Sequence, residues 1–239
     1  MIKRFIDILF SLIGLIFLAP ILIPVLILVW KHDKKSPFYI APRVGKNGKI
    51  FNIIKLRSMY ISVDKNGVNS TSLNDVRITP VGHKIRKYKL DEFTQLWNVL
   101  IGDMSLVGPR PNVKSEVDSY TEIEKKLLSV KPGITDFSSI VFSDEGKILE
   151  NKKNPDLTYN QLIRPWKSRL GLIYIRHQSI LLDIKLIIFT LIALKSKHKS
   201  LKWVAKKLEK FKIEKNVVNI AKREQELFPF PPPGSDKIV

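Results

Sequence analysis

The feature that most constrains this chain is a run of 23 residues without a formal charge between Asp7 and Lys31. As a straight helix this run, Ile8 to Trp30, would reach roughly 34 Å, enough to cross a bilayer core of about 30 Å. It is longer than the apolar region of a signal peptide, and no small-residue cleavage pattern follows it. Because all faces of the helix would be apolar, a buried core helix fits less well. The N-terminus is therefore expected to enter a membrane.

Two prolines, Pro20 and Pro24, lie near the middle of this run, where each removes a backbone donor and crowds the preceding turn. Basic residues flank both ends, whereas a single-pass helix normally has its positive charge on one side. These flanking residues are Lys3, Arg4, Lys31, Lys34 and Lys35. The pattern favours a re-entrant helix that bends and returns to the face it entered. A kinked single-pass helix, which tolerates proline, is the alternative.

The charge balance points to polyanionic partners. Lys and Arg number 41 against 22 Asp plus Glu, a formal net charge of +19. Such a surplus suits nucleic acid, anionic lipid head groups or phosphorylated substrates. The chain has no cysteine, which excludes disulfides and thiolate metal sites, and its four histidines show no metal-ligand spacing.

The segment after the apolar run predicts a β-hairpin. Short strands are expected at residues 38–41 and 50–54, and the Asn47-Gly48 pair between them is a strong turn signal. A polar surface loop is expected at residues 62–74. An amphipathic stretch then runs from His83 to Leu100.

An acid pair, Asp91 and Glu92, lies in this stretch beside a predicted apolar helix face. The apolar face is formed by Leu90, Phe93, Leu96, Trp97 and Leu100. Acids near a helix start commonly cap it or complement its dipole. Alternatively, one carboxylate attacks phosphorus while the other positions a metal or the attacking group. Spacing alone does not separate the two interpretations.

A rigid basic turn follows the acid pair. Pro109 and Pro111 flank Arg110, which fixes the backbone around a planar guanidinium suited to phosphate oxygens. A surface arginine in a rigid turn is the plainer interpretation. The turn at residues 131–135 again combines a basic residue with a proline.

The last part of the chain is expected to be a basic amphipathic extension. Between Lys195 and Glu226 there are 11 Lys or Arg and 4 Glu, and an apolar stripe recurs every three or four residues. The stripe consists of Leu201, Val204, Leu208 and Phe211. Such a helix is typical of binding to a membrane surface, and a helix packed on its own domain is the alternative. The Pro-rich residues 228–234 cannot be helical and are expected to be extended or disordered.

Taken together, these segments over residues 1–195 resemble the bacterial sugar transferase family, the monotopic phosphoglycosyl transferases that act on polyprenyl phosphates. The most specific stretches are residues 75–82, 89–100 and 102–111, and residues 3–7 and 55–59 are similar to further family signatures. The resemblance implies a re-entrant membrane helix. It also implies a two-step reaction in which the Asp of the dyad attacks a UDP-sugar, releases UMP and holds the phosphosugar covalently until a polyprenyl phosphate accepts it.

Mapped onto this sequence, the resemblance makes Asp91 the nucleophile and a magnesium ligand, with Glu92 as its partner. Cations must offset the repulsion between a carboxylate and a diphosphate, so Mg²⁺ and basic side chains are expected at the site. The candidate phosphate-binding residues are Arg86, Arg110, Lys55 and Arg57. Asp183 matches a family acid and is expected to form a structural salt bridge.

Three positions depart from the family pattern. Ala19 precedes Pro20 where the family often has serine, Asp136-Phe137 replaces a common Gly-Trp, and Gly171 stands where an acid often precedes a tyrosine. The bend at Pro20 is expected to persist. These departures bear on the identity of the sugar more than on the type of reaction.

The sequence thus predicts a mostly helical α+β protein with three parts. Residues 1–35 form a re-entrant membrane helix, residues 36–195 a compact cytoplasmic catalytic domain with a β-hairpin and interface-lying amphipathic helices, and residues 196–239 the basic extension. The expected location is the bacterial inner membrane, with the domain facing the cytoplasm. The expected partners are a UDP-sugar, undecaprenyl phosphate and anionic lipids, without nucleic acid; the oligomeric state, a homodimer included, is open. The competing hypotheses are an inactive membrane scaffold of a glycan-assembly complex and a nucleic-acid-binding protein.

Overall fold

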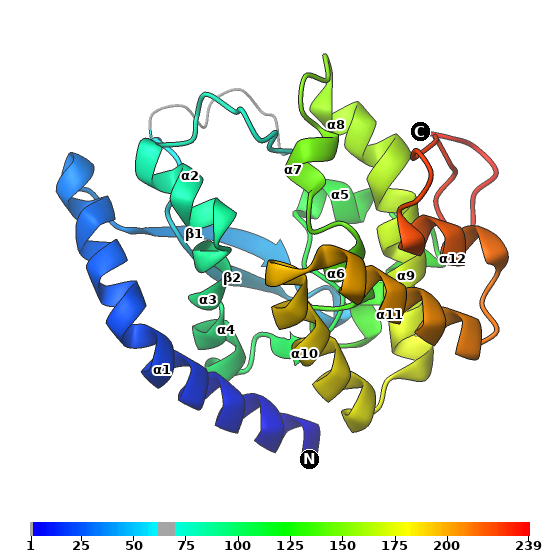
Figure 1. Cartoon of the computed structure of the whole chain (residues 1–239), viewed down its shortest axis with the longest axis horizontal. Coiled ribbons are helices and arrows are strands. Elements are labelled where there is room, and N and C mark those ends of the chain that lie inside the picture. The colour runs from blue at the N-terminus through cyan, green and yellow to red at the C-terminus, as the bar shows by residue number, and fades with distance from the viewer. Residues whose placement is uncertain (1, 62–69) are drawn as a thin grey trace.

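The computed structural model describes residues 2–61 and 70–239, so most of the predicted polar loop lies outside the described residues. The described chain is mostly helical with two small sheets, in agreement with the predicted α+β class (Figure 1). The α-helices are α1 (Ile2–Asp33), α2 (Pro80–Lys87), α3 (Leu90–Phe93), α4 (Leu96–Ile101), α5 (Lys114–Asp118), α6 (Phe137–Val141), α7 (Glu145–Ile148), α8 (Pro155–Thr158), α9 (Arg164–His177), α10 (Ile180–Lys195), α11 (Lys197–Lys210) and α12 (Lys215–Lys222). The strands are β1 (Phe38–Val44), β2 (Ile50–Leu56), β3 (Ser105–Val107) and β4 (Gly133–Thr135). Short 3₁₀ and π turns are η1 (Lys46–Gly48), η3 (Glu124–Ser129) and η4 (Tyr159–Ile163).

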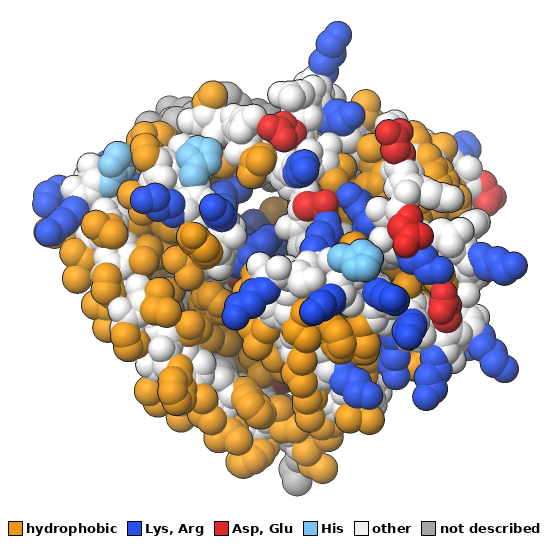
Figure 2. Space-filling model, in the orientation of Figure 1, with side chains coloured by type: hydrophobic (Ala, Val, Ile, Leu, Met, Phe, Trp, Pro, Cys, Tyr) orange, Lys and Arg blue, Asp and Glu red, His pale blue; other side chains and the backbone are white. Residues whose placement is uncertain are grey.

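The long N-terminal helix α1 continues through both Pro20 and Pro24. Its axis changes direction near the middle (Figure 1), as expected where prolines remove backbone hydrogen bonds. Within the described ranges, α1 is the one helix that is long and apolar enough to cross a membrane. Most of its apolar side chains are exposed, and in Figure 2 they merge with those of α10 into one apolar region.

The N-terminal end of α1 is fastened to the globular part of the protein. The Arg4 guanidinium donates to the carbonyls of Val99 and Leu100 in the last turn of α4, where carbonyl groups accept bonds from outside the helix. The buried Asp7 carboxylate accepts a hydrogen bond of 3.0 Å from the amide of Leu106 at β3. These bonds fix where the helix leaves the domain.

A third bond at this end comes from Lys3. Its ammonium forms a salt bridge of 2.5 Å with Asp183 of α10 and also donates to the carbonyl of Val107. The buried Tyr174 hydroxyl donates to the same Asp183 carboxylate at 2.7 Å. The predicted structural salt bridge of Asp183 is therefore confirmed.

The other end of α1 is fastened as well. The buried Arg57 guanidinium donates two hydrogen bonds, of 2.6 and 2.7 Å, to the Asp33 carboxylate. Nearby, Val29 packs with Leu56 and Ile85 in a small apolar cluster. Both ends of α1 therefore contact the same domain. The assignment of Arg57 to phosphate binding stays a prediction, and in this structure its guanidinium is paired with Asp33.

The predicted hairpin is confirmed, and its strands are longer than predicted. β1 pairs antiparallel with β2 from Phe38 opposite Leu56 to Val44 opposite Ile50. The connecting turn places Asn47-Gly48 at φ of 56° and 77°, the left-handed region that this dipeptide adopts readily. The second sheet is a short parallel pair, β3 with β4.

The main core lies among α6, α9, α10, α11 and α12. Its largest fully buried side chain is Trp166 of α9. Leu201, Val204 and Leu208 of α11 are buried in the same core, so the stripe that was interpreted as membrane-binding faces the protein instead. The alternative, a helix packed on its own domain, is what the structure has. The extension after residue 195 therefore shares the core of the domain that precedes it.

The Pro-rich tail is extended but well packed. The Phe230 ring stacks on Trp166 with ring centroids 4.4 Å apart, and Arg169 donates to the Pro231 carbonyl. The expectation of an extended chain is confirmed, and the expectation of disorder is wrong because these aromatic rings bind the tail to α9.

Candidate active site

The acid pair lies at the start of a short helix, not within a long one. The predicted amphipathic stretch is interrupted at Lys89, whose φ of 57° is left-handed, and this separates α2 from α3. Asp91 and Glu92 form the first turn of α3, while Trp97, assigned to the apolar face by its spacing, is 49% exposed. The kink rotates α3 and α4 relative to α2, so one continuous helical face does not exist.

Side chains of the α3–α4 segment form hydrogen bonds with the backbone of strand β2. The Asn98 carboxamide accepts from the amide of Ile54 and donates to the carbonyl of Asn52, at 2.9 and 2.7 Å. The Thr94 hydroxyl donates to the Ile54 carbonyl at 3.1 Å. These three bonds satisfy backbone groups along the open edge of the hairpin. They also place Lys55, the next residue of β2, beside the acid pair.

Helix α2 supplies the second basic residue. The Thr79 hydroxyl caps it by accepting from the Gly82 amide at 2.9 Å, with Pro80 in the first turn. A Cβ atom on Gly82 would lie 1.9 Å from the Ser58 carbonyl oxygen, so glycine is required for this close approach. The Arg86 guanidinium on the same helix donates to the Ser58 hydroxyl at 2.9 Å.

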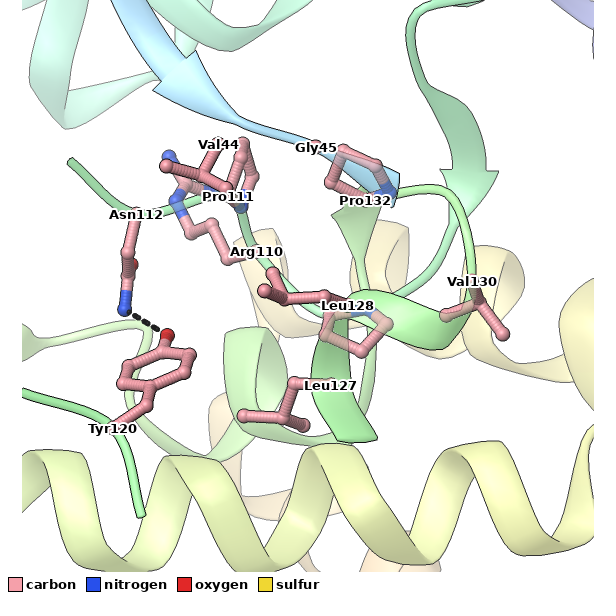
Figure 3. A pocket seen from close by; sticks show the side chains of 11 residues that line it. Val44, Gly45, Arg110, Pro111, Asn112, Tyr120, Leu127, Leu128, Val130 and Pro132 are labelled. Atoms are coloured by element: carbon pink, nitrogen blue, oxygen red, sulfur yellow. Dashed lines mark hydrogen bonds between the residues drawn. The ribbon is translucent and has the colours of Figure 1, made fainter. Parts of the chain in front are cut away.

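Arg110 is the third basic residue, and it pairs directly with the dyad. Its guanidinium donates two hydrogen bonds, of 2.8 and 3.2 Å, to the two Glu92 carboxylate oxygens. The backbone around it is fixed by flanking prolines and by the β3–β4 sheet. Arg110 also lines a small, mainly apolar pocket with Val44 and Pro111 (Figure 3). The guanidinium is thus presented on a rigid turn, as predicted.

The two acids of the dyad have different electrostatic environments. Burial alone would raise the pKa of Glu92, but the charges of Arg110 and Lys89 and the Arg110 hydrogen bond outweigh it and lower that pKa to about 2. Burial raises the pKa of Asp91, and the negative charge of the neighbouring Glu92 adds to the rise. The positive charges of Lys55, Arg86 and Arg110 oppose it. Glu92 is therefore a fixed anion bound to Arg110, and Asp91 is the more basic carboxylate.

The Asp91 carboxylate has one oxygen, Oδ1, that is buried and has no hydrogen-bond partner among the described residues. Buried carboxylate oxygens are normally paired, because an unpaired one loses its hydration without compensation. A strong acceptor is thus left available for a ligand. Lys55, whose charge acts on Asp91, has its pKa lowered to about 8 by burial and by Arg110.

The molecular surface is hollowed beside α2, the helix that carries Arg86. Figure 2 shows the hollow between α2 on one side and α7 and α11 on the other, with basic side chains inside it. Of the sequence-predicted site residues, Asp91, Glu92, Lys55, Arg86 and Arg110 are brought together. Arg57 lies elsewhere, where it donates to Asp33, and Pro20 and Pro24 lie in α1.

Two further charged residues of this region were missed by the sequence interpretation. The Lys89 Nζ atom lies 3.9 Å from Glu92 Oε1. Glu145 of α7 interacts electrostatically with Arg110. Lys89 directly precedes the acid pair and could have been suspected as a basic neighbour. Glu145 lies far along the chain in a segment without a recognisable motif, so only the fold brings it to the site.

The described residues could hold a magnesium ion only together with a substrate phosphate. Among residues 2–61 and 70–239 no group of three or more acidic or histidine side chains is positioned to hold a metal by itself. Mg²⁺, however, is commonly bound through one or two carboxylates together with substrate phosphates. The unpartnered Asp91 oxygen suits that role, whereas Glu92 is occupied by Arg110.

Comparison with known proteins adds an independent line of evidence. The family described as Bacterial sugar transferase matches residues 1–197. The chain is 34% identical over 203 residues to the galactosyl transferase CpsE of Streptococcus agalactiae serotype III (strain NEM316), covering 79% of this chain and 41% of that protein. It is 36% identical over 197 residues to the undecaprenyl-phosphate glucose phosphotransferase of Komagataeibacter xylinus, covering 79% and 35%.

A shorter relative matches over a smaller region. The putative undecaprenyl-phosphate N-acetylgalactosaminyl 1-phosphate transferase of Bacillus subtilis (strain 168) is 46% identical over 134 residues, 56% of this chain and 71% of the relative. The chain thus spans less than half of the two longer relatives and most of the shorter one. The region that matches the family, residues 1–197, contains the acid pair, the basic turn and the apolar N-terminus.

Proposed function

Because the chain belongs to the bacterial sugar transferase family, we propose that it transfers a sugar 1-phosphate from a UDP-sugar to undecaprenyl phosphate. Relatives named as undecaprenyl-phosphate sugar phosphotransferases support this choice of substrates. The observation that carries the proposal is the half-buried Asp91 carboxylate, with one oxygen unpartnered and the cations Lys55, Arg86 and Arg110 around it.

In the first step, an oxygen of the Asp91 carboxylate attacks the phosphorus that carries the sugar. A bond forms between this oxygen and phosphorus, the bond from phosphorus to the bridging oxygen breaks, and UMP leaves with that oxygen and its electron pair. The raised pKa of Asp91, caused mainly by burial, makes its carboxylate a better nucleophile than an exposed one. In the second step, an oxygen of undecaprenyl phosphate attacks the same phosphorus and Asp91 is released as a carboxylate.

The basic residues lower the cost of bringing a carboxylate to a diphosphate. Lys55 and Arg86 provide positive charge beside Asp91, where charge spreads over phosphate oxygens in the transition state. Arg110 holds Glu92 as a fixed anion and also adds positive charge at Asp91. Asp91 and the diphosphate would together hold Mg²⁺, which supplies charge neutralisation on the phosphate oxygens when bound.

The test of the nucleophile is release of UMP from a UDP-sugar in the presence of Mg²⁺ and undecaprenyl phosphate. Asp91→Asn keeps the size of the side chain and removes its nucleophilic charge, so we expect turnover to be lost. Glu122→Gln, at an 86% exposed side chain, is the matched control and should retain turnover. Wild-type release of UMP by Asp91→Asn would refute the assignment. No release by the wild-type protein with any UDP-sugar would favour an inactive scaffold.

We also propose that α1 is re-entrant and that the domain faces the cytoplasm of the bacterium. The support is that Lys3, Arg4 and Asp7 at one end and Asp33 at the other all contact one globular domain. A domain on one side of a membrane can bind both ends only if the helix returns to that side. Cysteines introduced near residues 3 and 35 should both react with a cytoplasmic reagent, and periplasmic labelling of either one would exclude this topology.

A further inference from the structure

A second acid, Glu145, interacts electrostatically with Arg110, the arginine that pairs with Glu92 of the dyad. It is the first residue of α7, and α7 lies on the opposite side of the hollow from α2 in Figures 1 and 2. The proposed reaction assigns it no role. An acid is unexpected in a site that must attract a diphosphate, because a carboxylate there repels the substrate phosphates. A ligand group that donates hydrogen bonds, unlike a phosphate oxygen, would therefore suit Glu145.

The Glu145 carboxylate is held by one side-chain partner and can accept further hydrogen bonds. Its Oε2 atom forms an ion pair with the Lys167 ammonium of α9, which is the one side-chain partner of this carboxylate among the described residues. The Glu145 side chain remains 33% exposed, whereas Lys167 is 17% exposed. The Lys167 ammonium also lies over the Tyr159 ring, 5.2 Å from its centroid. Part of the Glu145 side chain is thus accessible to a ligand.

Electrostatics link Glu145 to the arginine of the catalytic dyad. Burial alone would raise the pKa of Glu145, but the charge and hydrogen bond of Lys167, followed by the charges of Arg110 and Lys89, lower it overall. Glu145 in turn is among the charges that raise the pKa of Arg110. The group is therefore an ionised carboxylate, which only accepts hydrogen bonds, close enough to the dyad's arginine to interact with it.

The backbone that carries Glu145 is fixed from two directions. The preceding residue, Asp144, forms ion pairs with Lys197 of α11 at 2.5 Å and with Arg223, which directly follows α12, at 3.4 Å. On the other side, the carbonyl of Gly146 accepts from the Leu73 amide at 2.9 Å. A side chain on a backbone held this firmly is suited to selecting a ligand, since little ordering is needed on binding.

We infer that Glu145, with Lys167 beside it, binds hydroxyl groups of the UDP-sugar and is a specificity-determining residue of the site. An ionised carboxylate accepts hydrogen bonds from hydroxyl groups, and the adjacent ammonium can donate to hydroxyl or acetamido oxygens. Phosphate offers no donor to a carboxylate and is repelled by it. The hydroxyl donors of the substrate belong to its ribose or to its hexose. This inference rests on the proposed function.

The test compares Glu145→Gln with wild-type protein by UMP release. UDP-glucose, UDP-galactose, UDP-N-acetylglucosamine and UDP-N-acetylgalactosamine are each titrated with Mg²⁺ and undecaprenyl phosphate present. Loss of a charge-assisted hydrogen bond should raise the KM for the accepted UDP-sugar about tenfold and leave kcat within about twofold. Glu145→Asp, which retains the charge, should recover part of the loss. Glu122→Gln, on an exposed ion pair, is the control and should match wild type.

Deoxy substrates identify the hydroxyl group. The KM penalty of Glu145→Gln should disappear when the contacted hydroxyl is already missing, either from the ribose (2′-deoxyuridine substrates) or from one position of the hexose. A penalty that persists with every singly deoxygenated substrate would overturn the inference, as would a fall in kcat at unchanged KM.

Failure of this inference can be distinguished from failure of the proposed transfer reaction. If wild-type protein releases no UMP from any substrate, the transfer reaction is refuted, and calorimetric titration with the same UDP-sugars then decides the inference. Weaker binding by Glu145→Gln than by wild type supports hydroxyl recognition. Equal binding, or no binding of any UDP-sugar by wild type, overturns it.

Discussion

Lys55 allows a sharp test of how the site works. Burial, followed by the nearby charge of Arg110, lowers the pKa of its ammonium to about 8. The proposed reaction needs this charge beside Asp91, so activity should fall as Lys55 loses its proton. Lys55→Arg keeps a positive charge at all accessible pH values, because arginine does not deprotonate in proteins.

The magnitude follows from the pKa. With a pKa of about 8, about 90% of the Lys55 side chains are charged at pH 7 and about 10% at pH 9, so kcat for UMP release should fall roughly tenfold over this range. In Lys55→Arg the alkaline decline should be absent up to about pH 9.5. Lys55→Met should have uniformly low activity and no alkaline decline centred near pH 8.

The assay is the pH dependence of kcat for UMP release at saturating UDP-sugar, measured at constant ionic strength. Lys46→Arg is the matched control, because Lys46 is an exposed lysine on the hairpin turn. Its profile should follow that of wild type. If Lys55→Arg retains the wild-type decline near pH 8, another group titrates there and the reasoning from Lys55 is refuted.

Three further predictions concern the framework around the site. Arg110→Met should destabilise the fold by about 2 kcal/mol in denaturant titrations at pH 7, because it leaves the Glu92 carboxylate without its partner. Since the pKa of Glu92 is lowered to about 2 from an ordinary 4.5, that stabilisation is complete above pH 4.5 and lost toward pH 2, so the difference between variant and wild type should vanish at low pH; a constant difference would contradict it. Asp7→Ala should cost about 2 kcal/mol, because it orphans a buried amide at β3, and an unchanged midpoint of denaturation would contradict this. Phe230→Ala should cost about 2 kcal/mol by removing the ring stacked on Trp166, and a tail that became no more susceptible to protease would argue against the packing.

Much of the local structure could be predicted from sequence because its causes are local. Asn47-Gly48 determines a tight turn between strands through backbone conformations that other residues adopt less readily. The prolines beside Arg110 restrict the backbone in the same direct way. An apolar run between charged residues likewise predicts a membrane helix without reference to the rest of the chain.

The helical patterns were less reliable where tertiary contacts decide the outcome. One left-handed residue, Lys89, separates α2 from α3 and so divides the predicted amphipathic stretch. The face inferred from spacing is wrong at Trp97, which is exposed, whereas the neighbouring Asn98 is buried because it bonds to strand β2. The apolar stripe of α11 was identified correctly, but a stripe does not state what covers it. In the structure Val204 and Leu208 pack into the domain core, where burial against protein replaces burial against lipid.

Three features could be identified before the fold was known: the acid pair, the basic turn and the apolar anchor. Each is specified by neighbouring residues, and together they match a family. Which charged side chains meet could not be predicted in this way and depends on the fold. Arg57 pairs with Asp33 at the end of α1, whereas Arg110 pairs with Glu92. Glu145, from a distant helix, interacts electrostatically with the same Arg110. The physical reason is that electrostatic interactions act through space, over distances between side chains that only the folded backbone fixes.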